Sequence, residues 1–395
     1  MPTLAVDGGA PVRARLLPYG HQTIDETDIA AVVGALRSDW LTTGPAVEKF
    51  EQDFARSVGA RYAVALANGT AALLAAAFAA GVGPDTSVIT TPMTFAASAN
   101  CARYLGARVG FADVQADSLN LDPARVAEQV TGDTRAIIAV DYTGQPADLE
   151  ELRAQAERAG ALLIEDAAHA LGGTYQGRPV GSIAHLTTFS LHPVKQITTG
   201  EGGVVTTDDE QLALRVRRFR NHGITTDARQ REAAGQWHYE MVELGFNYRL
   251  TDLQCALGSA QLPRLPGWIA RRRELAARYA AAFGSEPAIE LPTVRPGRES
   301  AWHLYVIRLR LERLKADRMQ VFRALRAENI GVNVHYIPVP WHPYYQQLGF
   351  RRGAWPIAEA AYERILSLPM WAGMTDADAD DTIAAVRKVL HAYAG

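Results

Sequence analysis

Short apolar segments alternate with helix-patterned segments from about residue 60 to residue 207. Seven of the apolar segments have the length and composition of β-strands: Tyr62–Ala67, Ser87–Thr90, Arg108–Ala112, Arg135–Asp141, Ala161–Glu165, Thr187–Phe189 and Val204–Thr206. Helix-patterned segments lie between several of them, at 70–80, 96–105 and 148–159. This alternation predicts an α/β fold with a mostly parallel seven-stranded sheet and helices on both faces. Only a loop joins the last two strands, which predicts that at least one strand runs antiparallel.

The pattern changes beyond about residue 258. An Arg-rich amphipathic stretch at 269–283 leads into a linker of Pro, Gly and charged residues at 286–300. A smaller α+β pattern follows, with a strand at 304–310, a helix at 317–328, a strand at 331–335 and a helix at 376–393. We therefore predict a large domain over residues 1–258 and a small C-terminal domain over residues 259–395.

Composition narrows the class of protein. Of the 395 residues, 48% are apolar and 21% are charged, as in folded globular proteins, and the net charge of −3 argues against binding nucleic acid. The two cysteines, Cys101 and Cys255, cannot form a disulfide framework, and no group of residues has metal-ligand spacing. The most apolar run, 71–80, is far shorter than the ~20 residues that span a bilayer. With no export signal evident, we expect a cytoplasmic protein with no membrane partner and no metal.

Lys195 lies in a glycine-rich segment, about thirty residues after the carboxylate Asp166. A lysine amine can form a Schiff base with an aldehyde, and a buried Asp can keep a pyridine nitrogen protonated. Asp166 also follows an apolar strand, at the edge where open α/β sheets bind their ligands. Together the two residues predict a site for pyridoxal 5′-phosphate (PLP). Taken singly, Lys195 fits a solvated loop and Asp166 fits a cap of the next helix equally well.

Three further residues form a candidate phosphate cradle. Gly69 and Thr70 stand between a strand and an Ala/Leu-rich helix, where glycine and free N–H groups allow an anion to approach the backbone. Ser190 ends another strand five residues before Lys195, which brings its hydroxyl within reach of a phosphate. Ordinary turns, with Thr70 as a helix cap, are the alternative for these positions.

Two rings and two polar residues complete the candidate site. Phe95 follows a strand and has a ring that can stack on a flat cofactor. His169 can pack against the ring of the cofactor or donate a hydrogen bond to one of its oxygens. Packing in the core is the alternative for both. Asn247 and Arg249 can bind anions, or they simply precede a helix that Thr251 caps.

The chain resembles the PLP-dependent nucleotide-sugar aminotransferases of fold type I, the DegT/StrS group, over almost its whole length. Seven segments carry the resemblance in order: 38–45, 67–73, 91–95, 165–170, 190–203, 247–252 and 334–338. The resemblance implies an aspartate-aminotransferase-like fold, with a large PLP domain and a small C-terminal α+β domain. It also implies a homodimer with two active sites at the subunit interface.

The resemblance assigns a role to each matching residue. Lys195 is similar to the Schiff-base lysine and Asp166 to the partner of the pyridinium nitrogen, while Phe95 and His169 match the residues on the two faces of the ring. Gly69, Thr70 and Ser190 match the phosphate cradle, which Asn247 completes from the other subunit. The expected contacts to the substrate are Thr42, Arg249 and Tyr336.

Within the family, residues 140–146 and 192–203 are most similar to the C4-aminating enzymes of pseudaminic acid synthesis. This implies a UDP-linked 4-keto-6-deoxy-N-acetylhexosamine as substrate and glutamate as amino donor. Asp141 departs from the family, because many members have His there. A dTDP-linked 3- or 4-ketosugar is an alternative substrate. A PLP sugar dehydratase would carry His in place of Lys195, and a PLP-sensing regulator would need a DNA-binding module that this chain has no room for.

Overall fold

The computed structural model describes residues 3–226 and 228–395, and a seven-stranded sheet in the order β1-β9-β8-β5-β4-β2-β3 forms the centre of the larger part. Its strands are β1 (Tyr62–Leu66), β2 (Ser87–Thr90), β3 (Arg108–Phe111), β4 (Thr134–Val140), β5 (Leu162–Asp166), β8 (Leu186–Ser190) and β9 (Gly203–Thr207). The first and last residues of each strand lie within one residue of the predicted bounds. β9 is antiparallel to both β1 and β8, and the other pairs are parallel, so the predicted sheet is confirmed.

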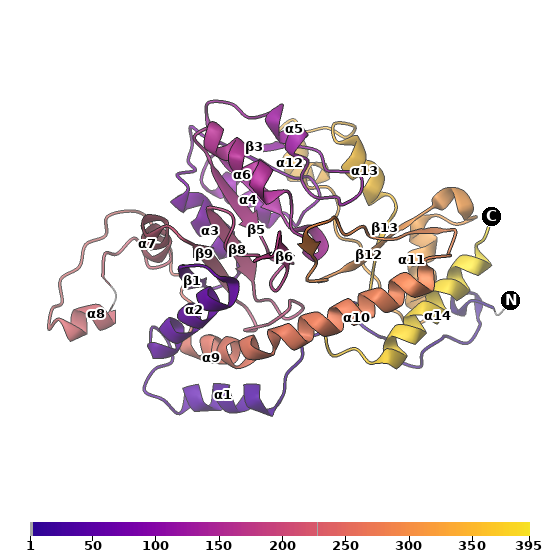
Figure 1. The fold of residues 1–395 in the computed structure, drawn as a ribbon, viewed down its shortest axis with the longest axis horizontal. Coiled ribbons are helices and arrows are strands. Elements are labelled where there is room, and N and C mark those ends of the chain that lie inside the picture. Colours follow the sequence, from indigo (N-terminus) through magenta and orange to yellow (C-terminus); the bar gives the residue numbers. More distant parts are fainter. Residues whose placement is uncertain (1–2, 227) are drawn as a thin grey trace.

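Helices cover both faces of this sheet (Figure 1). One face carries α3 (Gly69–Ala79), α4 (Ala97–Tyr104) and α7 (Glu210–Phe219). The other carries α2 (Pro45–Val58), α5 (Pro123–Ala127), α6 (Leu149–Arg158) and α9 (Asp252–Gln261). α3 is apolar on all sides because it is buried between the sheet, α4 and α7.

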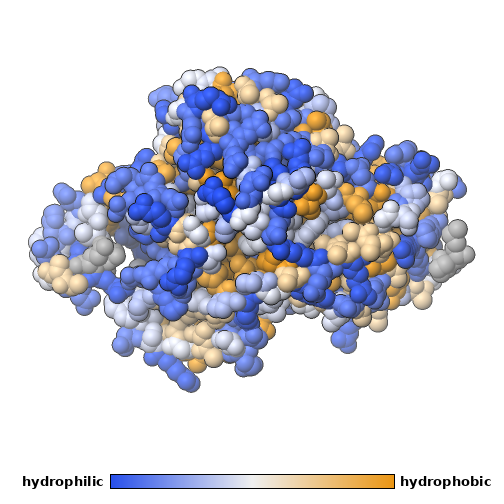
Figure 2. Space-filling view, viewed as in Figure 1, coloured by the Kyte–Doolittle hydropathy of each residue, from blue (hydrophilic) through white to orange (hydrophobic). Residues whose placement is uncertain are grey.

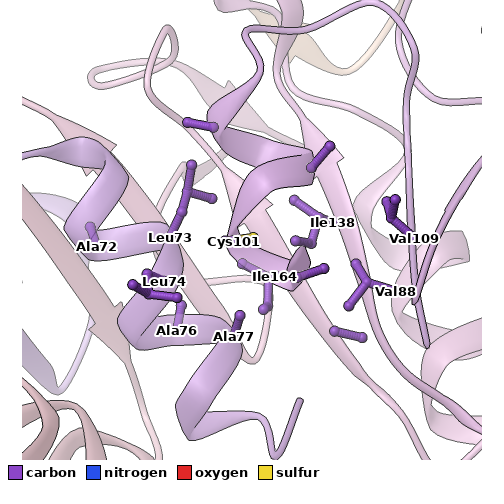
Figure 3. Close-up of a cluster of buried hydrophobic side chains, with 14 of the residues drawn as sticks. Ala72, Leu73, Leu74, Ala76, Ala77, Val88, Cys101, Val109, Ile138 and Ile164 are labelled. Atoms are coloured by element: carbon purple, nitrogen blue, oxygen red, sulfur yellow. The ribbon is translucent and has the colours of Figure 1, made fainter. Parts of the chain in front are cut away.

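The alternation of side chains along the strands decides which residues face α3 and α4. Figure 3 shows side chains of α3 and α4 against Val88, Val109, Ile138 and Ile164 of four strands. Leu163 lies in the cluster on the opposite face. Because successive strand residues point to opposite faces, Asp166 shares the face of Ile164, and Glu165 shares that of Leu163.

A second, antiparallel sheet forms the C-terminal part of the molecule. It consists of β10 (Ile289–Glu290), β12 (Tyr305–Leu309) and β13 (Ile365–Leu368), with α10 (Leu265–Phe283), α11 (Arg318–Ala327) and α14 (Asp376–Ala392) around the same core. Leu4 and Leu17 of the N-terminal segment belong to this core, and both chain ends lie beside it (Figure 1). The domain boundary expected after residue 258 stays a prediction.

The strand predicted at 331–335 is wrong. Within these residues, all of which the structure describes, Asn333 alone makes a bridge, with Ser367 of β13. Gly331 approaches Leu17 so closely that a Cβ would lie 2.5 Å from its carbonyl oxygen. The backbone then leads Asn333 to Tyr336 into the cavity described below, and β13 takes the place beside β12.

Smaller elements surround these two sheets. They are α1 (Glu26–Leu36), α8 (Ala228–Ala233), α12 (Pro343–Gln347), α13 (Pro356–Tyr362), and a small sheet of β6 (Thr174–Tyr175), β7 (Arg178–Pro179) and β11 (Arg298–Glu299). α1 packs on α9, and α8 lies on an arm between the paired residues Asn221 and Asn247 that extends away from the body (Figure 1). Within the described residues, the helices are all too short or too polar to cross a membrane.

Candidate active site

A cavity of about 1010 Å³ opens where the parallel strands of the large sheet end. Residues that follow β1, β2 and β5 line it, together with the end of β8 and the loop that carries Lys195. Residues 333–336 of the C-terminal part close another side. The cavity is large enough for a cofactor and part of a substrate.

The first turn of α3 lies at one end of this cavity. Asn68 caps the helix by accepting a hydrogen bond from the Ala71 N–H at 2.8 Å. Gly69 sits against Ser190, so that a Cβ on Gly69 would lie 2.9 Å from the Ser190 Cβ. Gly69, Thr70 and Ser190 therefore line the cavity together, with a hydroxyl beside a helix N-terminus, as an anion requires.

Asp166 ends β5 and is 5% exposed. Its Oδ2 accepts a hydrogen bond from the Ser98 hydroxyl of α4 at 2.6 Å, and its Oδ1 accepts one from the Ala168 N–H at 3.2 Å. Burial raises the pKa of Asp166, and these hydrogen bonds and the Lys195 charge act against that rise. A buried carboxylate of this kind is stabilised by a cation that enters the cavity.

Lys195 lies on the loop between β8 and β9, and its Nζ is 3.5 Å from Nε2 of His303. Burial lowers the pKa of the Lys195 amine to about 8, although the negative charge of Asp166 works against this, and Arg272 lowers it further. At pH 7 about a tenth of the amine is therefore unprotonated. In that form it can attack a carbonyl or accept a proton.

Phe95 and His169, the two residues predicted to contact the faces of the cofactor ring, both line the cavity. Phe95 is 62% exposed and His169 is buried. His169 Nε2 lies 3.0 Å from the hydroxyl of Tyr336, whose ring centroid is 6.2 Å from that of Phe95. Burial and the nearby Lys195 lower the pKa of His169 well below its usual range, so the imidazole is neutral. Tyr336, expected to contact the substrate, thus lines the same cavity.

Three predicted residues do not line the cavity of their own chain. Thr42 is exposed and pairs with Thr251, and Asn247 is exposed and pairs with Asn221. Arg249 is partly buried and donates a hydrogen bond to the Asn221 side chain at 2.7 Å. Their predicted roles stay predictions, because a second copy of the chain would be needed to bring them to a site.

Sequence analysis missed three residues that the fold brings into the cavity: Ser98, His303 and His335. Ser98 lies one turn beyond Phe95, so the helix pattern at 96–105 was a usable signal for it. The two histidines come from the C-terminal part, and no local pattern assigns them. Burial and Lys195 lower the pKa of His335 to about 4, and its Nδ1 lies 2.8 Å from the Ser367 hydroxyl.

The donor set fits pyridoxal phosphate. One cavity contains an amine of lowered pKa, a buried carboxylate on which the charge of this amine acts, and a helix N-terminus held against a serine hydroxyl. These groups match the aldehyde, the ring nitrogen and the phosphate of the cofactor. Phe95 and His169 add rings that can cover a flat ligand.

The sequence matches the family model described as the DegT/DnrJ/EryC1/StrS aminotransferase family over residues 22–387. It is 42% identical over 381 residues to the spore coat polysaccharide biosynthesis protein SpsC of Bacillus subtilis (strain 168). The matched region covers 96% of this chain and 98% of SpsC.

Solved structures of sugar aminotransferases have the same fold. The PMP-form of the putative sugar aminotransferase Spr1654 from Streptococcus pneumoniae has a TM-score of 0.90 and 32% identity, covering 95% of this chain and 99% of that one. The same protein is known in a PLP-form. Helicobacter pylori PseC, an aminotransferase involved in the biosynthesis of pseudoaminic acid, has a TM-score of 0.89 and 29% identity, covering 96% of this chain and all (100%) of PseC.

Proposed function

The chain belongs to the DegT/DnrJ/EryC1/StrS aminotransferase family, and we propose that it transfers the amino group of glutamate to the keto group of a nucleotide-linked sugar. It is a PLP-dependent aminotransferase with the fold of the sugar aminotransferases. The observation that carries the proposal is the meeting of Lys195, Asp166 and the first turn of α3 in one cavity.

In this proposal each residue holds one part of the cofactor. When bound, pyridoxal phosphate supplies a ring that withdraws electrons from the carbon beside the transferred nitrogen. Lys195 attaches it through Nζ, and Asp166 pairs with its ring nitrogen. The first N–H groups of α3, with the hydroxyls of Thr70 and Ser190, bind its phosphate.

The remaining residues shape the space around the reaction. Phe95 and His169 cover the two faces of the cofactor, which orients it. His169 stays neutral because burial lowers its pKa. It therefore adds no positive charge that would compete with the ring nitrogen for Asp166. Ser98 fixes the Asp166 carboxylate through its hydrogen bond, and so holds it in one orientation.

Lys195 also moves the protons. With a pKa of about 8, its amine is present in both protonation states near neutral pH. The neutral Nζ takes a proton from the α-carbon of the amino donor, and the protonated Nζ returns one to the former keto carbon of the sugar. Glutamate leaves as 2-oxoglutarate before the sugar reacts, which gives ping-pong kinetics.

The proposed substrate is a UDP-linked 4-keto-6-deoxy-N-acetylhexosamine that is aminated at C4. The resemblance of 140–146 and 192–203 to the pseudaminic acid branch supports this choice, as does the structural likeness to PseC. The likeness to SpsC supports a role in supplying a sugar for a polysaccharide. Arg249 supplies a guanidinium suited to a diphosphate.

The proposed active unit is a homodimer in which Asn247, Arg249 and Thr42 serve the site of the other subunit. Asn247 is exposed and outside its own cavity. The arm that ends at Asn247 carries Trp237, which is 84% exposed, and Leu244, which is 77% exposed. Figure 2 also shows hydrophobic side chains at the surface of α1, at the bottom of the view. Apolar surface of this kind is typically covered by a partner, and a second copy is the commonest one.

A substrate panel tests the proposal. Purified protein is given glutamate with UDP- and dTDP-linked 4-ketosugars and 3-ketosugars, and 2-oxoglutarate and the amino sugar are measured. We expect turnover with the UDP-linked 4-ketosugar and an amine on C4 in the NMR spectrum of the product. Reaction only with dTDP-sugars, or an amine on C3, would contradict the substrate, and no 2-oxoglutarate from any ketosugar would contradict the function.

A further inference from the structure

The side chain of His303 lies against the amine of Lys195. The Nε2 of His303 lies 3.5 Å from Nζ. The imidazole is 4% exposed, and its ring centroid is 4.5 Å from that of His169, which lines the same cavity. The lysine and this histidine are 108 residues apart in the sequence. Their contact is therefore a product of the tertiary structure.

The backbone around His303 is held rigidly from two directions. The Arg272 guanidinium donates to the carbonyl oxygens of Trp302 at 3.0 Å, His303 at 3.3 Å and Met370 at 3.1 Å. Gly144 lies on the other side, with a φ of +113°, and a Cβ there would be 3.0 Å from the His303 nitrogen and from the His169 oxygen. Three chain segments can meet behind Lys195 only because residue 144 has no side chain.

The imidazole of His303 is neutral. Burial lowers its pKa well below the usual range, and the positive charges of Lys195 and Arg272 contribute to this, as do His169 and His335. A neutral imidazole nitrogen can accept a hydrogen bond from an ammonium group, and the other tautomer can donate one to a free amine. His303 can therefore remain bonded to Lys195 in both protonation states of the lysine.

We propose that His303 is a positioning residue, which holds the Lys195 amine by a hydrogen bond from Nζ to Nε2 whenever that amine is not attached to the cofactor. This rests on the proposed function, in which Lys195 must be released and must then carry protons. A free lysine side chain has four rotatable bonds and would leave the reacting carbon. One fixed hydrogen bond to a rigid acceptor keeps Nζ at the place where the protons are exchanged.

The test compares His303→Leu with His303→Gln, whose amide keeps an acceptor. In cofactor-free protein, acetic anhydride labelling of Lys195 is followed by mass spectrometry from pH 6 to pH 10. Because an acceptor stabilises the ammonium form, we expect the pKa of the Lys195 amine to fall by about one in H303L and to change little in H303Q. In the complete enzyme, kcat should fall roughly tenfold or more in H303L with KM nearly unchanged, and H303Q should restore most of it.

His391→Leu is the matched control, because His391 is exposed on α14, remote from the cavity. Thermal unfolding of all three variants shows whether each is folded, and His303→Ala, which also lacks an acceptor, replaces H303L if H303L is not. An unchanged lysine pKa and kcat in a folded H303L would overturn the inference. A rise in KM alone would also overturn it, since His303 would then be a substrate contact. Borohydride labelling separates the two hypotheses: a label on Lys195 in H303L leaves the proposed function intact.

Discussion

Asp141 and Glu165 are both fully buried, and their carboxyl groups lie close to each other on the face of the large sheet opposite to Asp166. Asp141 Oδ1 accepts from the Ala147 N–H at 2.9 Å, and Glu165 Oε2 accepts from the Thr187 hydroxyl at 2.8 Å. The other oxygen of each group, Asp141 Oδ2 and Glu165 Oε1, has no hydrogen-bond partner among the described residues. Because two buried carboxylates repel each other, we infer that one of the two groups carries a proton.

This pair makes stability depend on pH. Burial raises the pKa of Asp141 well above its usual range, and the neighbouring Glu165 adds to the rise. An acid whose pKa is raised by folding contributes its stability at low pH and loses it as the pH rises through the folded pKa. Asp141→Asn can still accept from the Ala147 N–H but does not titrate. We therefore expect its free energy of unfolding, relative to the native sequence, to increase steadily from pH 5 to pH 8.

Urea unfolding of the cofactor-free protein, at one protein concentration, measures this difference. Asp85→Asn is the control, because it makes the same substitution at an exposed position outside this pair. A difference between Asp141→Asn and the native sequence that stays constant across this pH range would show that Asp141 is not the group that carries the proton.

Replacing Lys195 should abolish covalent attachment of the cofactor. Borohydride reduction of the native enzyme is expected to fix a pyridoxyl group on the peptide that contains Lys195. Lys195→Arg keeps the positive charge but cannot attach the cofactor, and we expect it to lose activity by about 10²- to 10⁴-fold or more, because the proton carrier is gone. Mass spectrometry of the reduced protein locates the label. A label on another lysine would refute the assignment.

Asp166 should matter more for catalysis than for folding. An Asn at this position still accepts from Ser98 but does not pair with a protonated ring nitrogen. Such an electrostatic contribution is worth ~3–4 kcal/mol, so kcat should fall by roughly two to three decades in Asp166→Asn. Since burial raises the pKa of Asp166, removing its charge should leave the melting temperature of the cofactor-free protein unchanged or higher. Near-normal turnover with bound cofactor would contradict the role.

Gly69→Ala should weaken cofactor binding. The added methyl group would press on Ser190, and the overpacking would displace the helix N-terminus from the hydroxyl that it faces. We expect the Kd for pyridoxal phosphate to rise by about tenfold. Gly83→Ala is the control, because a Cβ there meets no atom within 4 Å. Fluorescence titration of both variants measures the Kd, and equal values would remove Gly69 from the cradle.

Hybrid dimers test the shared site. Lys195→Ala and Asn247→Ala proteins are each expected to have little activity, but mixing them with subunit exchange should restore part of it. One of the two sites in a hybrid then has both residues intact. Asn329→Ala, mixed in the same way with Lys195→Ala, controls for exchange itself, since Asn329 lies in the C-terminal part and donates to the Arg13 carbonyl. A monomer that is fully active in solution would contradict the dimer.

Local pattern was sufficient for most of the fold. The apolar runs of the large sheet predicted its strands to within one residue, because a buried strand needs a short run of apolar side chains bounded by turn residues. The same reasoning failed at 331–335, where the composition is strand-like but the backbone follows Leu17 and the cavity wall instead. Tertiary packing overrode a local preference there.

Residues next to strand ends, such as Asp166 and Ser190, could be identified from the sequence, because the edge of a parallel sheet gathers those ends in one place. The folded chain was needed to show that Ser98 contacts Asp166, that His303 contacts Lys195, and that Asp141 and Glu165 are buried close together. Periodicity records how each segment is buried. It does not record which distant segment supplies the partner, and these contacts depend on the order of the strands and on the approach of the C-terminal part.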